Sequence, residues 1–259
     1  MDLGLEGRTA VVTGASRGIG LAITRGLAAH GVRVVAGARR SSAELGQLAK
    51  QGQVRVLEVD LAEPGGPAQL VALAESGPDI LVNNVGGAPA RTGGFLSITD
   101  EDWQASLTLN LMAAVRATRS VLPAMLAAGK GSIVTVCSVN AELPDPAVLD
   151  YSAAKAALAG FCKALSKEVG PRGVRVNTVS PGPVATDLWL GDHGVAQTVS
   201  QATGAQAGDV ASQAAHQTVT GRFSRPEEVA DLVLMLASDR TANVTGADFR
   251  IDGGLVPTW

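Results

Sequence analysis

Tyr151 and Lys155 are two side chains that could move a proton together. They are four residues apart in Tyr-Ser-Ala-Ala-Lys-Ala-Ala-Leu. This segment predicts a helix, on which positions i and i+4 share one face. A phenol with an ordinary pKa of about 10 exchanges protons slowly near neutral pH, and a neighbouring ammonium favours the phenolate. The pair, which contains the only tyrosine of the chain, therefore predicts a general acid or base. The alternative is a half-buried aromatic beside a surface lysine.

Two further polar residues fit the same chemistry. Ser138 follows an apolar strand-like run and precedes Tyr151 by 13 residues (151 − 138). Its hydroxyl could bind a substrate carbonyl and stabilise oxyanion character, although a polar strand terminus is the simpler interpretation. Asn110 lies inside a long helical pattern, where a buried asparagine needs partners or marks a kink.

A glycine-rich turn follows the first apolar run, in Thr13-Gly-Ala-Ser-Arg-Gly-Ile-Gly20. Such glycines permit a tight turn and let the backbone approach a pyrophosphate at a helix N-terminus. The spacing departs from G-x-G-x-x-G, and no Lys-Ser/Thr follows as in a Walker A loop. Its position favours nucleotide binding over an ordinary strand-to-helix turn.

Together these motifs resemble the short-chain dehydrogenase/reductase family, in particular its single-domain, β-ketoacyl reductase-like members. The chain carries the family signature T-G-x-x-x-G-I-G in full, and Asn83-Asn-Val-Gly86 is similar to N-N-A-G. Further matches are the Ser…Tyr-x-x-x-Lys set, Pro181-Gly182 and Asp252-Gly253-Gly254. The likeness extends over nearly the whole chain.

The resemblance implies four catalytic residues: Asn110, Ser138, Tyr151 and Lys155. In the family the asparagine sits in a helix kink and holds water for a proton relay toward the lysine, and the lysine also holds the nicotinamide ribose. The implied cofactor-binding residues are Gly14, Ser16, Arg17, Gly18, Ile19, Gly20, Arg39, Asp60, Leu61, Asn84, Gly86, Tyr151, Lys155, Pro181, Gly182, Val184 and Thr186. Taken alone, Asp60 could be a helix cap and Thr186 a loop residue.

The residues after the second strand-like run predict which nicotinamide cofactor binds. Ala38 stands where an acidic residue would bind the ribose hydroxyls of NAD, and Arg39 follows it. A guanidinium offers a planar fork of donors to a phosphate, and Arg17 is a second cation within reach. NADP(H) is therefore favoured over NAD(H). Arg40 is interpreted as a solvated charge at a helix entrance.

Apolar runs alternate with amphipathic segments along the chain. The strand-like runs are 9–13, 32–37, 54–59, 80–83, 132–137, 174–179 and 247–251, and the helix-like segments are 18–30, 43–51, 67–76, 102–128, 152–169 and 226–237. Nearly continuous apolar strands are typical of parallel sheets buried on both faces. We expect one α/β domain over residues 1–259: a Rossmann-type doubly wound, mainly seven-stranded parallel sheet with helices on both faces.

Residues 187–225 break this rhythm, being rich in Ala, Gln, Gly, Ser and Thr. We expect a substrate lid containing local helix rather than a disordered loop. The substrate pocket should be bounded by residues 87–96, 139–150 and 187–220, where Leu188 and Trp189 could form an apolar wall. Because the second segment carries Glu142, Asp145 and Asp150, we expect no strong preference for polyanionic substrates.

Composition excludes several other classes. The 259 residues carry a formal charge of −3, and 21 Lys and Arg are spread along the chain, so no nucleic-acid partner is expected. No apolar run approaches the ~18 residues of a membrane helix and no signal peptide is visible, which indicates a cytoplasmic protein. Cys137 and Cys162 predict small core residues, and three scattered histidines make a metal site improbable.

The motifs predict NADPH-dependent reduction of a ketone or aldehyde to an alcohol, with Tyr151 as proton donor. The nearest alternative is NAD(P)+-dependent oxidation of a secondary alcohol. A third hypothesis is a non-catalytic NADP(H)-binding sensor or scaffold. The presence of all four implied catalytic residues argues against it. A β-ketoacyl thioester, a polyketide-type ketone and a small cyclic ketone all remain open, with family frequency favouring the first. The resemblance also implies a homotetramer, or a dimer, in which the Ala-rich helix 152–169 packs between subunits.

Overall fold

A computed structural model describes residues 2–258 of the chain. Its centre is a parallel sheet with the strand order β3-β2-β1-β4-β5-β6-β7. The strands are β1 (Thr9–Thr13), β2 (Arg33–Ala38), β3 (Val54–Glu58), β4 (Ile80–Asn83), β5 (Gly131–Val136), β6 (Val174–Pro181) and β7 (Asp248–Ile251). Each begins and ends within two residues of its predicted bounds, and the predicted doubly wound α/β fold is confirmed.

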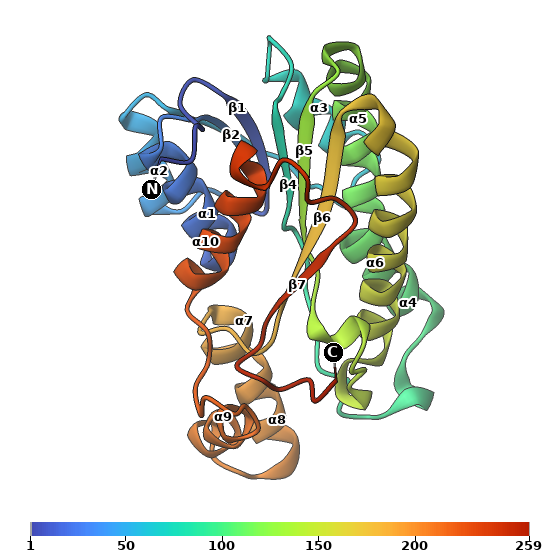
Figure 1. Ribbon diagram of the computed structural model, residues 1–259. Helices are drawn as coiled ribbons and strands as arrows, with labels where there is room; N and C mark the ends of the chain where they lie inside the picture. The colour runs from blue at the N-terminus through green and yellow to red at the C-terminus, as the bar shows by residue number, and fades with distance from the viewer. Residues whose placement is uncertain (1, 259) are drawn as a thin grey trace.

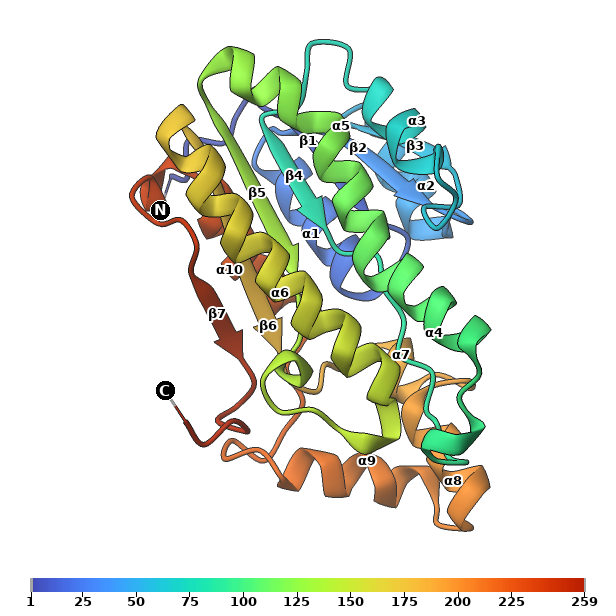
Figure 2. The same ribbon diagram turned by 90° about the vertical axis from the view of Figure 1, so that its right-hand side faces the viewer.

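Helices cover both faces of this sheet (Figure 1). They are α1 (Gly18–Ala29), α2 (Ala43–Lys50), α3 (Gly66–Ala72), α4 (Asp100–Leu107), α5 (Ala113–Ala128), α6 (Leu149–Val169), α7 (Asp187–Leu190), α8 (Val195–Thr203), α9 (Ala207–His216) and α10 (Pro226–Ala237). The helices α1 and α10 pack against each other on one face, and α3, α5 and α6 lie on the other (Figure 2).

The alternation of side chains along β1 explains why its apolar run is continuous. Ala10 and Val12 belong to the core shared with α1 and α10, whereas Val11 belongs to the core under α5 and α6. All three are fully buried. Successive side chains of a strand point to opposite faces, so a sheet covered on both sides requires apolar residues at every position.

The segment predicted as one helix, 102–128, starts at Asp100 and is divided. A π-helical turn, Thr108–Met112, separates α4 from α5. By length and composition alone, Asp100–Ala128 is apolar enough to cross a membrane, with a mean hydropathy of 1.2 in its most apolar window. That result was not expected from the sequence. In the fold, Ala113, Ala117 and Val121 of this helix pack into the core beneath the sheet.

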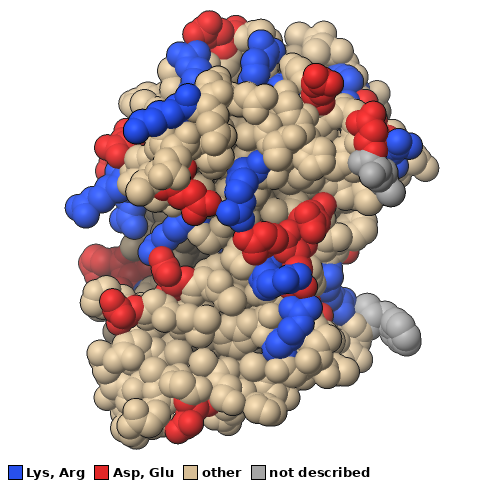
Figure 3. Space-filling model, turned by 90° about the vertical axis from the view of Figure 1, so that its left-hand side faces the viewer, with Lys and Arg blue, Asp and Glu red and all other residues tan. Residues whose placement is uncertain are grey.

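The expected lid is mostly helical rather than irregular. The short helices α7, α8 and α9 occupy most of residues 187–216 and lie together beyond the carboxyl ends of the strands (Figures 1 and 2). Few residues of this segment are charged, and Figure 3 shows the lower part of the molecule as nearly free of charged side chains on that face. The sequence signal was weak because the helices are short and bury little: Ala196 is the buried residue of α8, and α9 has none.

Both cysteines are free and buried, which confirms their prediction as small core residues. Burial raises the pKa of Cys162 to about 12 and also raises the pKa of Cys137. Neither thiol is therefore activated for chemistry at neutral pH.

Leu27→Ala should destabilise the fold strongly, because Leu27 is completely buried in the core that contains α1 and α10. Removing such a side chain leaves a cavity and costs about 2–5 kcal/mol of unfolding free energy. Urea unfolding followed by circular dichroism measures this cost. The matched control is Leu96→Ala, since Leu96 is 96% exposed. Equal effects of the two substitutions would contradict the assignment of the core.

Candidate active site

A cleft of about 1150 Å³ runs along the carboxyl ends of the strands. It is larger than the ~300–1,000 Å³ of a typical small-molecule pocket, which suits a dinucleotide together with a substrate. The strand order reverses between β1 and β4, and ligands of such sheets bind at this switch point. Every predicted catalytic or cofactor residue except Asn110 lines the cleft.

The glycine turn after β1 and the chain after β4 are in close contact. The Asn84 side chain donates to the carbonyls of Thr13 and Gly14 at 3.1 and 3.0 Å. A Cβ on Gly20 would lie 2.1 Å from the Gly14 oxygen and 2.4 Å from Asn84 Nδ2. Gly14 and Gly18 have positive φ angles of 68° and 53°. Only glycine fits these positions, so the backbone stays open to a pyrophosphate at the α1 N-terminus.

Three arginines stand at one end of the cleft. Arg39 and Arg40 follow β2, and Arg17 precedes α1; all three are exposed and line the cleft. Arg17 lies 3.7 Å from Asp187, but both side chains are more than half exposed, so this ion pair is weak. The Asp60 carboxylate accepts from the Ala62 amide at 2.9 Å, so it caps its turn as well as lining the cleft.

The other end holds the residues that are predicted to transfer a proton. Tyr151 lies in the first turn of α6, and Lys155 one turn later has its Nζ 5.6 Å from the centre of the phenol ring. Lys155 is 3% exposed and donates to the Val136 carbonyl at 2.9 Å. The Ser138 hydroxyl, just beyond β5, is held by Asn140: it accepts from the backbone amide at 3.1 Å and donates to Oδ1 at 3.2 Å.

Asn110 lies at the centre of the π-helical turn and is buried. Its side chain bonds Gly87 in both directions, accepting from the amide and donating to the carbonyl, each at 3.0 Å. A Cβ on the neighbouring Gly86 would lie 2.8 Å from Asn110 Oδ1 and 3.7 Å from Lys155 Nζ. The asparagine therefore fixes the chain after β4 beside Lys155, and the helix is interrupted at Asn110 by a π-helical turn, where the resemblance implies a kink. Its role in a proton relay stays a prediction.

The two ends of the predicted lid are held next to each other by backbone contacts. Val184 forms a β-bridge with Ser224, and the Ala185 amide donates to the Ser224 carbonyl at 2.9 Å. Next to this bridge, a Cβ on Gly18 would lie 3.1 Å from the methyl group of Thr186. The predicted Pro181–Thr186 segment thus touches the glycine turn at the base of the lid.

The substrate side of the cleft agrees only in part with the sequence. Of the first predicted boundary of the pocket, residues 87–96, Gly87 and Ala88 line the cleft and the other residues do not. Leu109 and Leu255 also line the cleft, although neither was predicted to do so. Both were missed because one lies in a helix interior and the other in the C-terminal tail, where no motif marks them. Of the three acids used to disfavour polyanionic substrates, only Asp145 lines the cleft; Glu142 pairs with Arg250 at 2.8 Å.

The third of these acids, Asp150, is completely buried and pairs with Arg91 at 2.5 Å. Sequence reasoning did not single out Arg91. The two residues are 59 positions apart, so no local pattern connects them. The argument from Glu142 and Asp150 against polyanionic substrates is therefore wrong, because neither carboxylate reaches the cleft.

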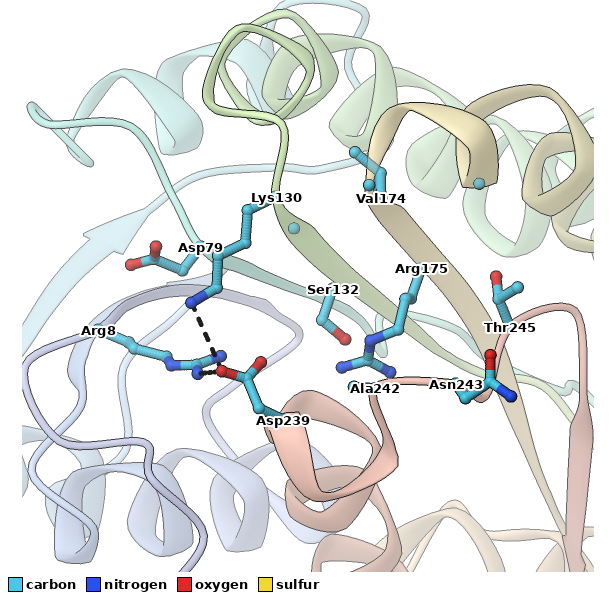
Figure 4. A pocket seen from close by; sticks show the side chains of 13 residues that line it. Arg8, Asp79, Lys130, Ser132, Val174, Arg175, Asp239, Ala242, Asn243 and Thr245 are labelled. Atoms are coloured by element: carbon cyan, nitrogen blue, oxygen red, sulfur yellow. Dashed lines mark hydrogen bonds and ion pairs between the residues drawn. The ribbon is translucent and has the colours of Figure 1, made fainter.

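A second cavity, of about 280 Å³, lies at the opposite edge of the sheet (Figure 4). Its charges bond to one another and to the backbone. Asp239 accepts from Arg8 and lies 3.5 Å from Lys130, and Arg175 donates to the Ser238 carbonyl at 3.0 Å. None of the predicted site residues lines this cavity. The contacts around this cavity join the amino ends of the strands. The predicted catalytic and cofactor-binding residues, apart from Asn110, line the larger cleft.

Comparisons with known proteins agree with this geometry. Residues 14–256 match the family described as Enoyl-(Acyl carrier protein) reductase. The chain is similar to the 3-oxoacyl-(acyl-carrier-protein) reductase FabG of Escherichia coli, with 35% identity over 98% of this chain and 99% of that protein. It is 36% identical to D-threitol dehydrogenase of Mycolicibacterium smegmatis, covering 98% of this chain and 94% of that one. Among solved structures, L-sorbose reductase of Gluconobacter frateurii, complexed with NADPH and L-sorbose, superposes over 100% of both chains with a TM-score of 0.89 and 36% identity.

Gly20→Ala should weaken the binding of NADPH. The added Cβ would lie 2.1 Å from the Gly14 oxygen, so the turn that faces the pyrophosphate must move. We expect the Kd for NADPH to rise at least about tenfold, equivalent to ~1.4 kcal/mol. Fluorescence titration with NADPH measures it. Gly46→Ala in α2 is the control, because a Cβ there meets open space; unchanged binding in Gly20→Ala would exclude this turn as the pyrophosphate site.

Proposed function

The chain belongs to the short-chain dehydrogenase/reductase family, and we propose that within it the protein reduces a neutral ketone bearing an apolar substituent to a secondary alcohol. It is an NADP(H)-dependent oxidoreductase. The observation that carries the proposal is the placement of Ser138, Tyr151 and Lys155 at one end of a cleft whose other end presents Arg39.

The residues of the cleft fit NADPH. Gly14, Gly18 and Gly20 leave the backbone open at the α1 N-terminus, and Arg39 stands where the ribose of a dinucleotide reaches the end of β2. The structural relative from Gluconobacter frateurii is complexed with the same cofactor. When bound, NADPH supplies the hydride.

The side chains of this protein supply the proton and orient the carbonyl. Asn140 fixes the Ser138 oxygen, and the serine hydroxyl can rotate its proton toward a substrate carbonyl. Tyr151 then donates its phenolic proton to the developing alkoxide, a step that contributes about 10²–10⁴-fold when the acid is well placed. Lys155 is held by the Val136 carbonyl, and its ammonium stabilises the phenolate that remains. Oxidation of an alcohol uses the same residues in reverse.

The lining of the substrate side supports a neutral, largely apolar ketone. Leu109, Leu143, Val148, Trp189 and Leu255 surround it. Among the described residues that line the cleft, the cations are Lys155 and the three arginines of the opposite end. A carboxylate substrate would therefore lack a cationic partner beyond Lys155, whereas Asn140, Asp145 and Gln217 also line the cleft and can bind neutral polar groups of a substrate. A 3-oxoacyl thioester, the substrate type in the name of the Escherichia coli relative, fits this lining best.

Assembly and location are part of the proposal. The outward face of α6 carries the small, exposed residues Ala153, Ala156, Ala157 and Gly160, which permit close helix packing between copies. We therefore propose a homotetramer, or a dimer, that acts in the cytoplasm on a small-molecule substrate.

Tyr151→Phe tests the function directly. It removes the only tyrosine hydroxyl of the chain and should lower kcat for ketone reduction by about 10²–10⁴-fold, with a much smaller change in the Kd for NADPH. The measurement is NADPH oxidation against a panel containing a 3-oxoacyl thioester, a cyclic ketone, L-sorbose and a keto acid. Undiminished turnover would remove Tyr151 as the acid. If the wild-type protein binds NADPH tightly but turns over no ketone of the panel, the hypothesis of a non-catalytic sensor is favoured.

Arg39→Ala should weaken the preference for NADPH over NADH. Hydrogen bonds to charged groups contribute about 1.5–3 kcal/mol, so we expect the KM for NADPH to rise roughly 10–100-fold. The KM for NADH should stay nearly constant, because NADH lacks the 2′-phosphate. Steady-state kinetics with both cofactors measures the ratio, and Arg40→Ala is the matched control with a smaller expected effect. An equal loss with NADH would show that Arg39 does not recognise the phosphate.

A further inference from the structure

A fully buried carboxylate stands immediately before Tyr151. The Asp150 side chain has 0% exposure and lies in the first turn of α6. Negative charge near a helix N-terminus is favourable, but that effect is too small to offset removal of a carboxylate from water. Asp150 therefore needs a close partner.

Arg91 is that partner and holds Asp150 with a fork of hydrogen bonds. Its Nη2 lies 2.5 Å from Asp150 Oδ2, and its Nε lies 3.2 Å from each carboxylate oxygen. Nη1 donates to Asp102 at 2.9 Å, and the Arg91 backbone amide donates to the Ala147 carbonyl at 2.6 Å. The pKa of Arg91 is raised, chiefly by its hydrogen bond to Asp150. A planar guanidinium fixes direction as well as distance, which an ammonium does not.

These contacts join three segments under the first turn of α6. Arg91 belongs to the connection between β4 and α4, whose first residues, from Asn84 onward, line the cleft. Asp102 closes the capping box of α4 with Thr99, and Ala147 precedes α6. Asn110 holds the same connection at Gly87. The connection between β4 and α4 is thus held at Gly87 by Asn110 and at Arg91 by Asp102 and Asp150.

We propose that Arg91 is a positioning residue for Tyr151: by holding Asp150, it sets the orientation of the first turn of α6 and so the placement of the phenol relative to Ser138 and Lys155. This inference rests on the proposed function. Arg91 itself does not line the cleft, so it acts through Asp150 and not on the substrate. Misplacement of a reacting group by about 1 Å can cost 100-fold in rate.

Three variants test the role by activity. Arg91→Met should lower kcat about 100-fold while the Kd for NADPH changes less than about twofold. Arg91→Lys restores the charge without the fork and should recover part of kcat. Arg91→Met with Asp150→Asn removes the unpaired buried charge and should recover thermal stability but not kcat. Recovery of kcat together with stability in the double variant, or wild-type kcat in Arg91→Met, would overturn the proposal.

Arg8→Met is the matched control. The Arg8 side chain is 13% exposed, against 15% for Arg91, and pairs with Asp239 at the opposite edge of the sheet. Its loss should lower the melting temperature without changing kcat below the unfolding range. A loss of kcat as large as that of Arg91→Met would indicate a general effect of weakened folding and would contradict positioning.

A second measurement does not depend on turnover. Tyr151 is the only tyrosine, so protein labelled with 3-fluorotyrosine gives a single ¹⁹F resonance from the proposed acid. Arg91→Met should shift or broaden that resonance, with partial return in Arg91→Lys and no change in Arg8→Met. An unmoved resonance in folded Arg91→Met would overturn the proposal, even if no ketone proves to be a substrate. Failure of the proposed function would instead appear as a wild-type protein without turnover whose resonance still responds to Arg91.

Discussion

The close contact between the turn after β1 and the chain after β4 is the constraint on which the site depends. At Gly14 and Gly20 there is no room for a Cβ, and the Asn84 amide occupies the carbonyls of the turn. This contact exists because the parallel sheet reverses its strand order between β1 and β4, which brings their carboxyl ends together. The same sheet edge places Ser138 after β5 and the base of the predicted lid after β6, so the residues predicted to bind the cofactor and to donate the proton line one cleft.

The distribution of charge along the cleft follows from the same arrangement. Arginines stand at the end of β2 and at the start of α1, and they line one end of the cleft. Toward Tyr151 the walls carry Leu143, Val148 and Trp189 as well as uncharged polar groups, and Lys155 is buried. A cation in an apolar environment acts strongly on neighbouring charge, because little water screens it. Arg91, another cation near this end, is held by Asp150 and Asp102 and does not line the cleft. At this end of the cleft, among the described residues, Lys155 is therefore the cation that lines the wall.

Much of this could be predicted from the sequence, for identifiable reasons. A strand buried on both faces must be apolar throughout, so Thr9–Thr13 and Val174–Pro181 are visible as runs. The glycine turn and the Ser138, Tyr151 and Lys155 set have fixed spacings that a local pattern can carry. The π-helical turn depends on a tertiary bond between Asn110 and Gly87, so no local pattern predicts it, and only the family resemblance pointed to an irregular helix at Asn110. The pairing of Arg91 with Asp150 could not be predicted for the same reason: the contact joins distant segments, and neither residue belongs to a motif. The lid helices were obscure because they bury few side chains.

The position of the lid base connects the two ends of the cleft. Val184 and Ser224 pin both ends of the lid to each other, and Thr186 packs against Gly18 of the turn that faces the pyrophosphate. Just beyond, Asp187 is within ion-pair distance of Arg17, whose exposed guanidinium can exchange this partner for a phosphate. Leu188 and Trp189 follow immediately in the chain and line the same cleft as Arg17. The first residues of the predicted lid therefore join the glycine turn to the end of the cleft that holds Tyr151.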